Sequence, residues 1–395
     1  MGVSLVLWND WLLVVMVMLT SFVLLYFPLA LAQVALIGRW LVRPLRRRIA
    51  APHPGRRLAV VVCTNGKAVA SVESLLARLR DYALPQVSLY VLKEAYDAHR
   101  YSAAEIVVPA DYHTPNGSWT KERALHYGAE WGRRHGWGWE TYVVHLDDDS
   151  LVSKEYLRYV LGMRGWAGQG SLKLRDHGQH LFSTLADLIR VVDCETYCRW
   201  ANEGGRPVAV HGEGLVLRAD VEQSIGWDYA TYCGEDFLMG QEVRSRGWGF
   251  EHIPYDIYIA PPIRARDFLK QRRRWMWGIF STAPRMWRRN RRTLVWLLYR
   301  YAVGWTGFLG FFLFVYTVIV HIPFPTWLAS IALFNMASYF FAYQVGAAKT
   351  RWRYMPEVLV LQFAVAMYEG ACLPYAMIFR PDRRSFDTIE KPAVS

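Results

Sequence analysis

The sequence predicts an α/β fold, a doubly wound and mostly parallel sheet, in a globular domain flanked by transmembrane helices. Two observations predict it. Strand-like and helical segments alternate over residues 58–150, which is the pattern of a parallel sheet covered by helices on both faces. Long apolar runs lie on either side of the charged region, over residues 11–37 and 294–379. The region between them is roughly 230 residues long, which is enough for one core.

The N-terminal apolar run, residues 11–37, exceeds the roughly 20 residues that a membrane-spanning helix needs. A signal peptide is the alternative, because Ala30-Leu31-Ala32 resembles a cleavage site, but the run is too long and the charged start of a signal peptide is missing. Basic residues stay on the cytoplasmic side, so we expect a cytoplasmic globular domain in an integral protein of the plasma membrane. The basic residues that follow the run are Arg39, Arg43, Arg46, Arg47 and Arg48.

Two further spans are expected over residues 294–320 and 324–347. The last run, 356–379, contains Glu369 together with helix-breaking residues, and as a full span it would leave a basic tail outside, against the charge rule. We therefore expect a broken or re-entrant segment, with a plain fourth span as the alternative. The expected parts are a membrane helix with a basic flank (1–49), the globular domain (50–263), an interface helix (264–292), a membrane region (293–379) and a cytoplasmic tail (380–395).

The formal net charge of +12 does not indicate a nucleic-acid partner. The basic residues gather beside the apolar runs, where attraction to anionic lipid explains them more simply.

Of the five cysteines, Cys194 and Cys198 could share a helix face. Two ligands without two more are a weak zinc signal, so reduced structural thiols are expected.

The globular region contains four strand-like segments, over residues 58–66, 87–94, 105–109 and 141–150, separated by helical segments such as 121–134. In doubly wound sheets ligands bind beyond the carboxyl ends of the strands. No glycine-rich phosphate loop is present, so polar side chains at the strand ends are the candidates. These are Thr64, Asn65, Glu94, Asp147, Asp148 and Asp149.

The acidic triplet is the strongest local signal. Residues two apart in an extended strand point the same way, so Asp147 and Asp149 are expected to converge on one cation while Asp148 faces elsewhere. Two carboxylates with open positions for diphosphate oxygens suit Mg²⁺ or Mn²⁺. A solvated acidic turn is the alternative.

A second acidic motif, "YCGEDF", places Glu235 and Asp236 at the start of a helical stretch. A carboxylate at a helix start is often only a cap. A third motif, "QRRRW", puts Gln271, Arg274 and Trp275 on one helix face, so that Arg272 and Arg273 are expected to point to lipid headgroups.

The segment 264–292 interleaves basic and aromatic residues, as a helix in the membrane interface does. An indole offers a flat face for a sugar ring, and an arginine grips diphosphate oxygens. We therefore expect one face to line a sugar site and the other to seat the domain on the membrane; an anchor alone is the alternative.

D-x-D, G-E-D and Q-x-x-R-W in this order resemble the inverting family 2 glycosyltransferases, which include cellulose and hyaluronan synthases. The chain resembles most the egghead-type glycolipid β-1,4-mannosyltransferases, in segments such as "VVPADYHTPNGSWTKERALHYGAE" and "GEDFLMGQEVRSRGWGFEHI". Glu94 stands where the family usually has Asp, and Asp149 where it commonly has Glu. The resemblance implies a GT-A-like fold, a divalent cation and a nucleotide sugar.

The resemblance also implies a role for each candidate residue. Asp236 is the base that deprotonates the acceptor, and Asp147 and Asp149 hold the metal. His211 and Gly212 lie in an acceptor-side loop, although the histidine is alternatively an ordinary core residue. Donor contacts fall to Thr64, Asn65, Glu94, Lys121, Arg123, Asp148 and Arg274, and acceptor contacts to Glu213, Glu235, Gln271 and Trp275.

The function implied is transfer of mannose from GDP-mannose to the 4-hydroxyl of a membrane glycolipid in a β-linkage. A processive β-mannan or β-glucan synthase, with a UDP-sugar as a possible donor, is the first alternative. A membrane-anchored sugar-binding scaffold without catalysis is the second. The intact carboxylate and Q-x-x-R-W set argues against the scaffold.

Overall fold

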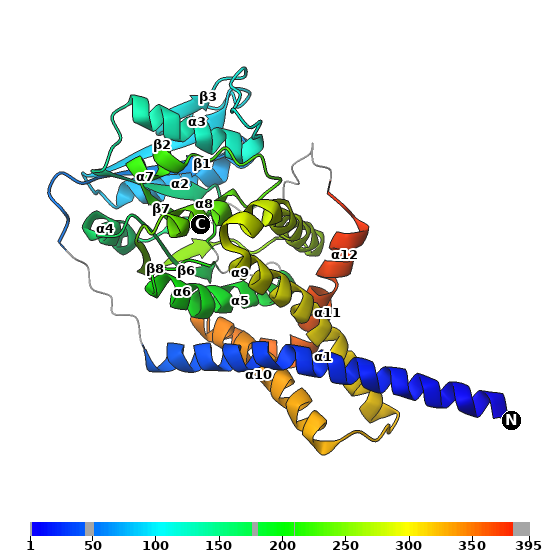
Figure 1. Cartoon of the computed structure of the whole chain (residues 1–395). Helices are drawn as coiled ribbons and strands as arrows, with labels where there is room; N and C mark the ends of the chain where they lie inside the picture. The colour runs from blue at the N-terminus through cyan, green and yellow to red at the C-terminus, as the bar shows by residue number, and fades with distance from the viewer. Residues whose placement is uncertain (1, 44–50, 176–180, 209, 382–395) are drawn as a thin grey trace.

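The structure is a computed structural model that describes residues 2–43, 51–175, 181–208 and 210–381 (Figure 1). The expected basic flank therefore lies partly outside the described residues, at Arg46, Arg47 and Arg48. The tail from residue 382 onward, with its arginines, also lies outside them.

Eight strands of the described chain form one sheet in the order β3-β2-β1-β4-β7-β6-β8-β5. The first four lie at the segments that alternation predicts, and they pair in parallel. The second half is mixed, because β7 runs antiparallel to both β4 and β6 while β6 and β8 are parallel. The strands are β1 (Arg57–Cys63), β2 (Val87–Glu94), β3 (Ala104–Val108), β4 (Thr141–Asp147), β5 (Leu151–Val152), β6 (Ala167–Leu174), β7 (Leu215–Arg218) and β8 (Phe250–Ile259).

Helices cover both faces of the sheet, as a doubly wound fold requires. Alternate residues of β1 belong to two different cores: Leu58 and Val60 pack with α2 and α4, whereas Ala59 and Val61 pack with α3 and α8. This is the two-residue period of a strand buried on both faces. The helices of the domain are α2 (Val69–Asp81), α3 (Thr120–Arg134), α4 (Lys154–Gly162), α5 (Leu181–Asp193), the π-helix η1 (Cys194–Cys198), α6 (Arg199–Glu203), α7 (Ala219–Ile225) and α8 (Glu235–Ser245).

Four helical segments in the described chain are long and apolar enough to cross a membrane. They are α1 (Gly2–Val42), α9 (Ala265–Ile319), α10 (Thr326–Thr350), and α11 (Tyr354–Gly370) with α12 (Cys372–Ile378). Within α9 the backbone of Asn290 is not helical, and its amide donates to Gln241 Oε1 at 2.9 Å. The break separates the amphipathic start of α9 from its apolar remainder.

The segment made by α11 and α12 begins beside the globular domain and ends beside the start of α9. Just before it, Lys349 Nζ lies 2.8 Å from Asp256 Oδ1 of β8. At its other end, the Trp277 indole of α9 donates to the Ala376 carbonyl at 3.0 Å. The helix is interrupted at Ala371, and α12 lies along the start of α9 (Figure 1). Residues Tyr354–Ile378 together are long and apolar enough to cross a membrane, so a broken or re-entrant segment and a plain fourth span both stay predictions.

Candidate active site

A cavity of about 930 Å³ lies at the carboxyl ends of the central strands and continues among the long apolar helices. It brings together nearly every residue that the sequence singles out, from segments more than 200 residues apart. The predicted residues that line it are Thr64, Asn65, Glu94, Lys121, Asp147, Asp148, Asp149, Glu213, Glu235, Asp236, Gln271, Arg274 and Trp275.

The acidic triplet lies where β4 stops. The strand ends at Asp147, and the chain turns through the next two residues. All three residues line the cavity, and the direction in which each carboxylate faces stays a prediction. Carboxylates are the ligands that Mg²⁺ or Mn²⁺ prefers, so the residue types present at this strand end suit such an ion.

Lys121 links the two acidic motifs. Its ammonium lies 2.6 Å from Asp147 Oδ1 and 3.6 Å from Glu235 Oε1. Burial opposes the charge on this lysine, but the nearby carboxylates outweigh burial and raise its pKa well above the usual value. Lys121 is therefore a permanent cation between two groups of carboxylates.

Asp236 occupies the first turn of α8, and its Oδ1 accepts a hydrogen bond from the Phe237 backbone N–H at 2.7 Å. Burial, and then the neighbouring Glu235, raise the pKa of Asp236 to about 7, although Lys121 opposes this. A carboxylate whose pKa lies close to neutral pH is suited to accept a proton during catalysis.

Gly212 lies between these groups. A Cβ placed on it would lie 2.7 Å from Lys121 Nζ and 3.5 Å from Asp236 Oδ2. It would also lie 4.0 Å from Asp147 Oδ2. The backbone of the expected acceptor-side loop thus approaches both acidic motifs, and only glycine leaves this space open.

At the end of β2, Glu94 lines the cavity but Arg123 does not. Arg123 forms an ion pair with Glu94, and its Nε donates to the Tyr112 carbonyl at 2.9 Å. Arg123 was expected to contact the donor from the cavity wall. Instead it lies outside the lining residues and fixes the position of Glu94.

The start of α9 contributes Gln271, Arg274 and Trp275 to the cavity wall, as the spacing predicts. The expectation that Arg272 points to headgroups is wrong. Its side chain is only 13% exposed and donates to the fully buried Asp187 at 2.8 Å. It also lies against the Trp275 ring, 4.5 Å from the ring centroid.

Arg273, also expected at the headgroups, points instead at α12. Its Nη1 donates to the Phe379 carbonyl at 3.2 Å, and its guanidinium lies 5.6 Å from the Tyr375 ring centroid. Sequence spacing could not find these partners, because they come from another part of the chain.

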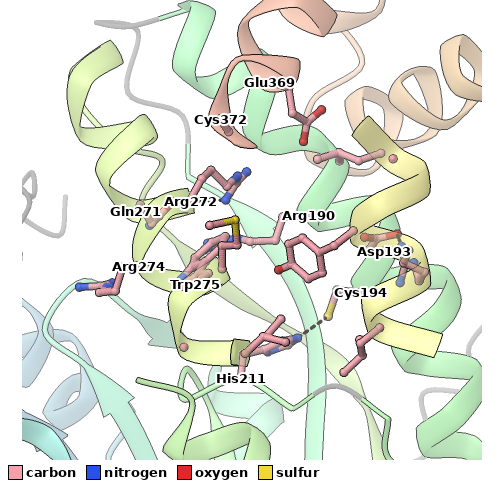
Figure 2. A pocket seen from close by; sticks show the side chains of 18 of the residues that line it. Arg190, Asp193, Cys194, His211, Gln271, Arg272, Arg274, Trp275, Glu369 and Cys372 are labelled. Carbon is pink, nitrogen blue, oxygen red and sulfur yellow. Dashed lines mark hydrogen bonds and ion pairs between the residues drawn. The ribbon is translucent and has the colours of Figure 1, made fainter. Parts of the chain in front are cut away.

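Charged residues deeper in the cavity were missed or left without a role. Arg190 of α5 lies beside Trp275, 5.0 Å from its ring centroid (Figure 2). It also lies 3.8 Å from Glu213 Oε1. Arg300 of α9 pairs with Asp193 at 2.7 Å, and Glu369 of α11 accepts from Tyr339 at 3.1 Å. The available signal was a charge within an apolar run, which marks a functional position by default.

The far end of the cavity has an apolar wall. Its side chains come from α1, α9, α10 and α11, the helices that are long enough to cross a membrane. Among them are Phe22, Phe311, Phe314, Phe340 and Phe363. The cavity is thus charged at the sheet and mostly apolar among the helices, where it also contains Arg300 and Glu369.

Comparison with known proteins agrees with this geometry. Residues 142–345, just over half of the chain, match the family model of Glycosyl transferase family group 2. Over 184 residues the chain is 30% identical to the β-1,4-mannosyltransferase egh of Drosophila melanogaster, covering 44% of this chain and 40% of that protein. Over 187 residues it is 27% identical to the β-1,4-mannosyltransferase bre-3 of Caenorhabditis elegans, covering 45% and 41%. The chain spans about two fifths of the length of these curated relatives.

One solved structure is similar over nearly the whole chain. It is the mannosyltransferase PcManGT from Pyrobaculum calidifontis in complex with GDP-Man and Mn²⁺. The TM-score is 0.55 at 16% identity, and the match covers 93% of this chain and 99% of that chain. This likeness shows a shared GT-A-like fold and confirms the fold expected from the sequence.

Proposed function

The chain belongs to Glycosyl transferase family group 2, and from this membership we propose that it transfers mannose from GDP-mannose to a membrane glycolipid. The linkage formed is β-1,4, with inversion at the anomeric carbon. The relatives egh and bre-3 support this choice of sugar and linkage, since both are named as β-1,4-mannosyltransferases. The complex of PcManGT supports GDP-mannose as the donor.

The observation that carries the proposal is the continuity of the cavity. One end is lined by the carboxylates of Asp147 and Asp236, and the other by aromatic side chains such as Phe311 and Phe363. A glycolipid needs both environments at once, because its sugar is polar and its chains are apolar. A soluble acceptor would gain nothing from the apolar end.

The donor fits the sheet end of the cavity. Thr64, Asn65 and Glu94 line the part formed by the first strands, where a nucleoside would lie. Lys121 and Arg274 are the cations available for the diphosphate. Asp147 and Asp149 would hold a divalent cation, which when bound supplies positive charge that stabilises the leaving diphosphate.

The acceptor reacts beside Asp236. Its carboxylate takes the proton of the acceptor hydroxyl as the oxygen attacks the anomeric carbon and the nucleoside diphosphate leaves from the opposite face. One base and one displacement invert the configuration, so an α-linked donor gives a β-linked product. Trp275 offers its ring to the acceptor sugar, and Arg190 and Arg272 beside that ring fix its orientation.

The catalytic domain is proposed to face the cytoplasm of a plasma-membrane protein. The basic Arg39 and Arg43 at the end of α1 support this orientation, since basic flanks remain on the cytoplasmic side. The interface helix at the start of α9 then seats the cavity at headgroup height.

The test uses detergent-purified full-length protein, a panel of radiolabelled nucleotide sugars and a membrane lipid extract, with and without Mn²⁺ or Mg²⁺. Metal-dependent label from GDP-mannose in a small lipid product is the expected result. Label from a UDP-sugar, or in a long polymer, would establish the alternative of a processive synthase. Absence of transfer from every donor would leave the sugar-binding scaffold.

A further inference from the structure

A cluster of two cysteines and one histidine lies in the cavity wall, apart from the acidic motifs. The ligand atoms of Cys194, Cys198 and His211 all lie within 4.8 Å of one another. Cys194 Sγ is 3.2 Å from His211 Nε2, and the two side chains face each other in Figure 2. Among the described residues, no other group of three His, Cys, Asp or Glu side chains brings its ligand atoms so close.

The backbone around the cluster is specialised. Cys194 and Cys198 are the first and last residues of η1, a single π-helical turn between α5 and α6. Such turns are rare and frequently occur at functional sites. Both cysteines are buried and reduced, at 2% and 6% exposure. The turn therefore presents two thiols on one side of the helix, toward the cavity.

His211 is held in place from the other side by Gln169. The fully buried Gln169 side chain donates to the carbonyls of His211 and Glu213, the latter at 3.0 Å, and accepts from the His211 N–H at 3.2 Å. The ring itself is poorly satisfied, because Nδ1 is buried without a hydrogen-bond partner among the described residues. The other ring nitrogen, Nε2, is the atom that faces the thiols, at 3.2 Å from Cys194 Sγ, and it is therefore the nitrogen available to a metal ion.

The donor chemistry selects the ion. Two thiolates and one imidazole are soft donors that prefer Zn²⁺, whereas the carboxylates of Asp147 and Asp149 prefer Mg²⁺ or Mn²⁺. In a tetrahedral zinc site, neighbouring ligand atoms lie roughly 3.4–3.8 Å apart. The cluster needs only small side-chain movements to reach that geometry. All three residues line the cavity, so the fourth position is open to it.

We propose that Cys194, Cys198 and His211 form a zinc site that fastens the acceptor-side loop to η1. The ion is bound by two thiolates and a neutral imidazole, so its binding releases two protons to solvent. The loop carries Gly212 and Glu213 to the catalytic cavity, next to Asp236 and Arg190. The zinc is thus a positioning device for the acceptor side, separate from the cation at the acidic triplet.

The first test is elemental analysis of full-length protein purified without added chelator. We expect about one zinc ion per chain, as for a structural site. Cys198→Ser and His211→Ala are expected to lose it, whereas Cys63→Ser and Cys233→Ser, which change thiols in the same cavity outside the cluster, keep it. Asp147→Asn also keeps the zinc. Zinc retained by both cluster variants would overturn the proposal.

A second measurement does not depend on the folding of any variant. Cobalt(II) added to zinc-depleted wild-type protein should give the intense near-ultraviolet absorption of thiolate-to-cobalt charge transfer, and zinc should displace it. No absorption and no zinc in the wild-type protein would overturn the proposal. Neither readout requires sugar transfer, so this test can fail while the proposed function stands, and the reverse.

Discussion

The guanidinium of Arg272 lies 4.5 Å from the centroid of the Trp275 ring, and the same side chain pairs with the buried carboxylate of Asp187. Arg272 belongs to the "QRRRW" motif, whose basic residues resemble a membrane anchor, but it is part of the cavity wall. We expect Arg272→Ala to destabilise the protein by about 3 kcal/mol, because it leaves Asp187 with only the longer contact to Arg190.

Denaturant unfolding measures this loss, and Arg264→Ala at the exposed start of α9 is the control. Transfer by Arg272→Ala is also expected to fall. Normal turnover together with unchanged unfolding would show that the arginine has no role in the cavity wall.

Replacing Asp236 by Asn removes the proposed base while keeping the shape of the side chain. Turnover is expected to fall about 10²–10⁴-fold, the usual contribution of general base catalysis. Donor binding, followed by calorimetry with GDP-mannose, should be unchanged, since Asp236 contacts the acceptor. Unchanged turnover would remove the base assignment.

The pH dependence follows from the same residue. The base must be deprotonated, and its pKa is raised to about 7 by burial and then by Glu235. Therefore kcat/KM should rise through pH 7 and fall about tenfold per unit below it. Because Glu235 raises that pKa, Glu235→Gln should lower it and move the acid limb to lower pH. An acid limb that stays at the same pH in this variant would show that the profile does not report the ionisation of Asp236.

Removing the divalent cation with a chelator should abolish transfer, and Mn²⁺ or Mg²⁺ should restore it. In Asp147→Asn the metal-ion concentration that gives half the maximal rate is expected to rise about tenfold, because the proposed Asp147 carboxylate ligand is lost. Asp81→Asn at the exposed end of α2 serves as the control. A metal requirement equal to that of the wild type would place the ion elsewhere.

Gly212→Ala tests the close approach of the acceptor-side loop. The added Cβ would lie 2.7 Å from Lys121 Nζ, the far end of a flexible side chain, so the fold should persist while the lysine is displaced from Asp147. A shift of this size is expected to cost about 10²-fold in turnover. Gly138→Ala, where a Cβ meets nothing within 4 Å, is the matched control. Equal turnover in both variants would show that Lys121 has no role.

Much of the fold could be predicted from the sequence because the relevant patterns are local. The two-residue period and polar ends of β1 to β4, and the lengths of the apolar helices, depend on neighbouring residues only. The mixed half of the sheet could not be predicted in this way. There β7 joins β4 to β6 in antiparallel pairing, which long connections and long-range contacts decide.

The sequence by itself predicted which residues make up the site. Motif order assigns roles to Asp147, Asp236 and Trp275 as predictions, and the structure gathers these residues at one cavity. Only the tertiary structure decided which charged side chains form ion pairs. Arg272 pairs with Asp187 instead of facing lipid headgroups, and Arg123 pairs with Glu94 instead of lining the cavity. It also brought His211 to Cys194, 17 residues away. Burying an unpaired charge is costly, and only the folded chain brings together partners as distant in sequence as Arg272 and Asp187.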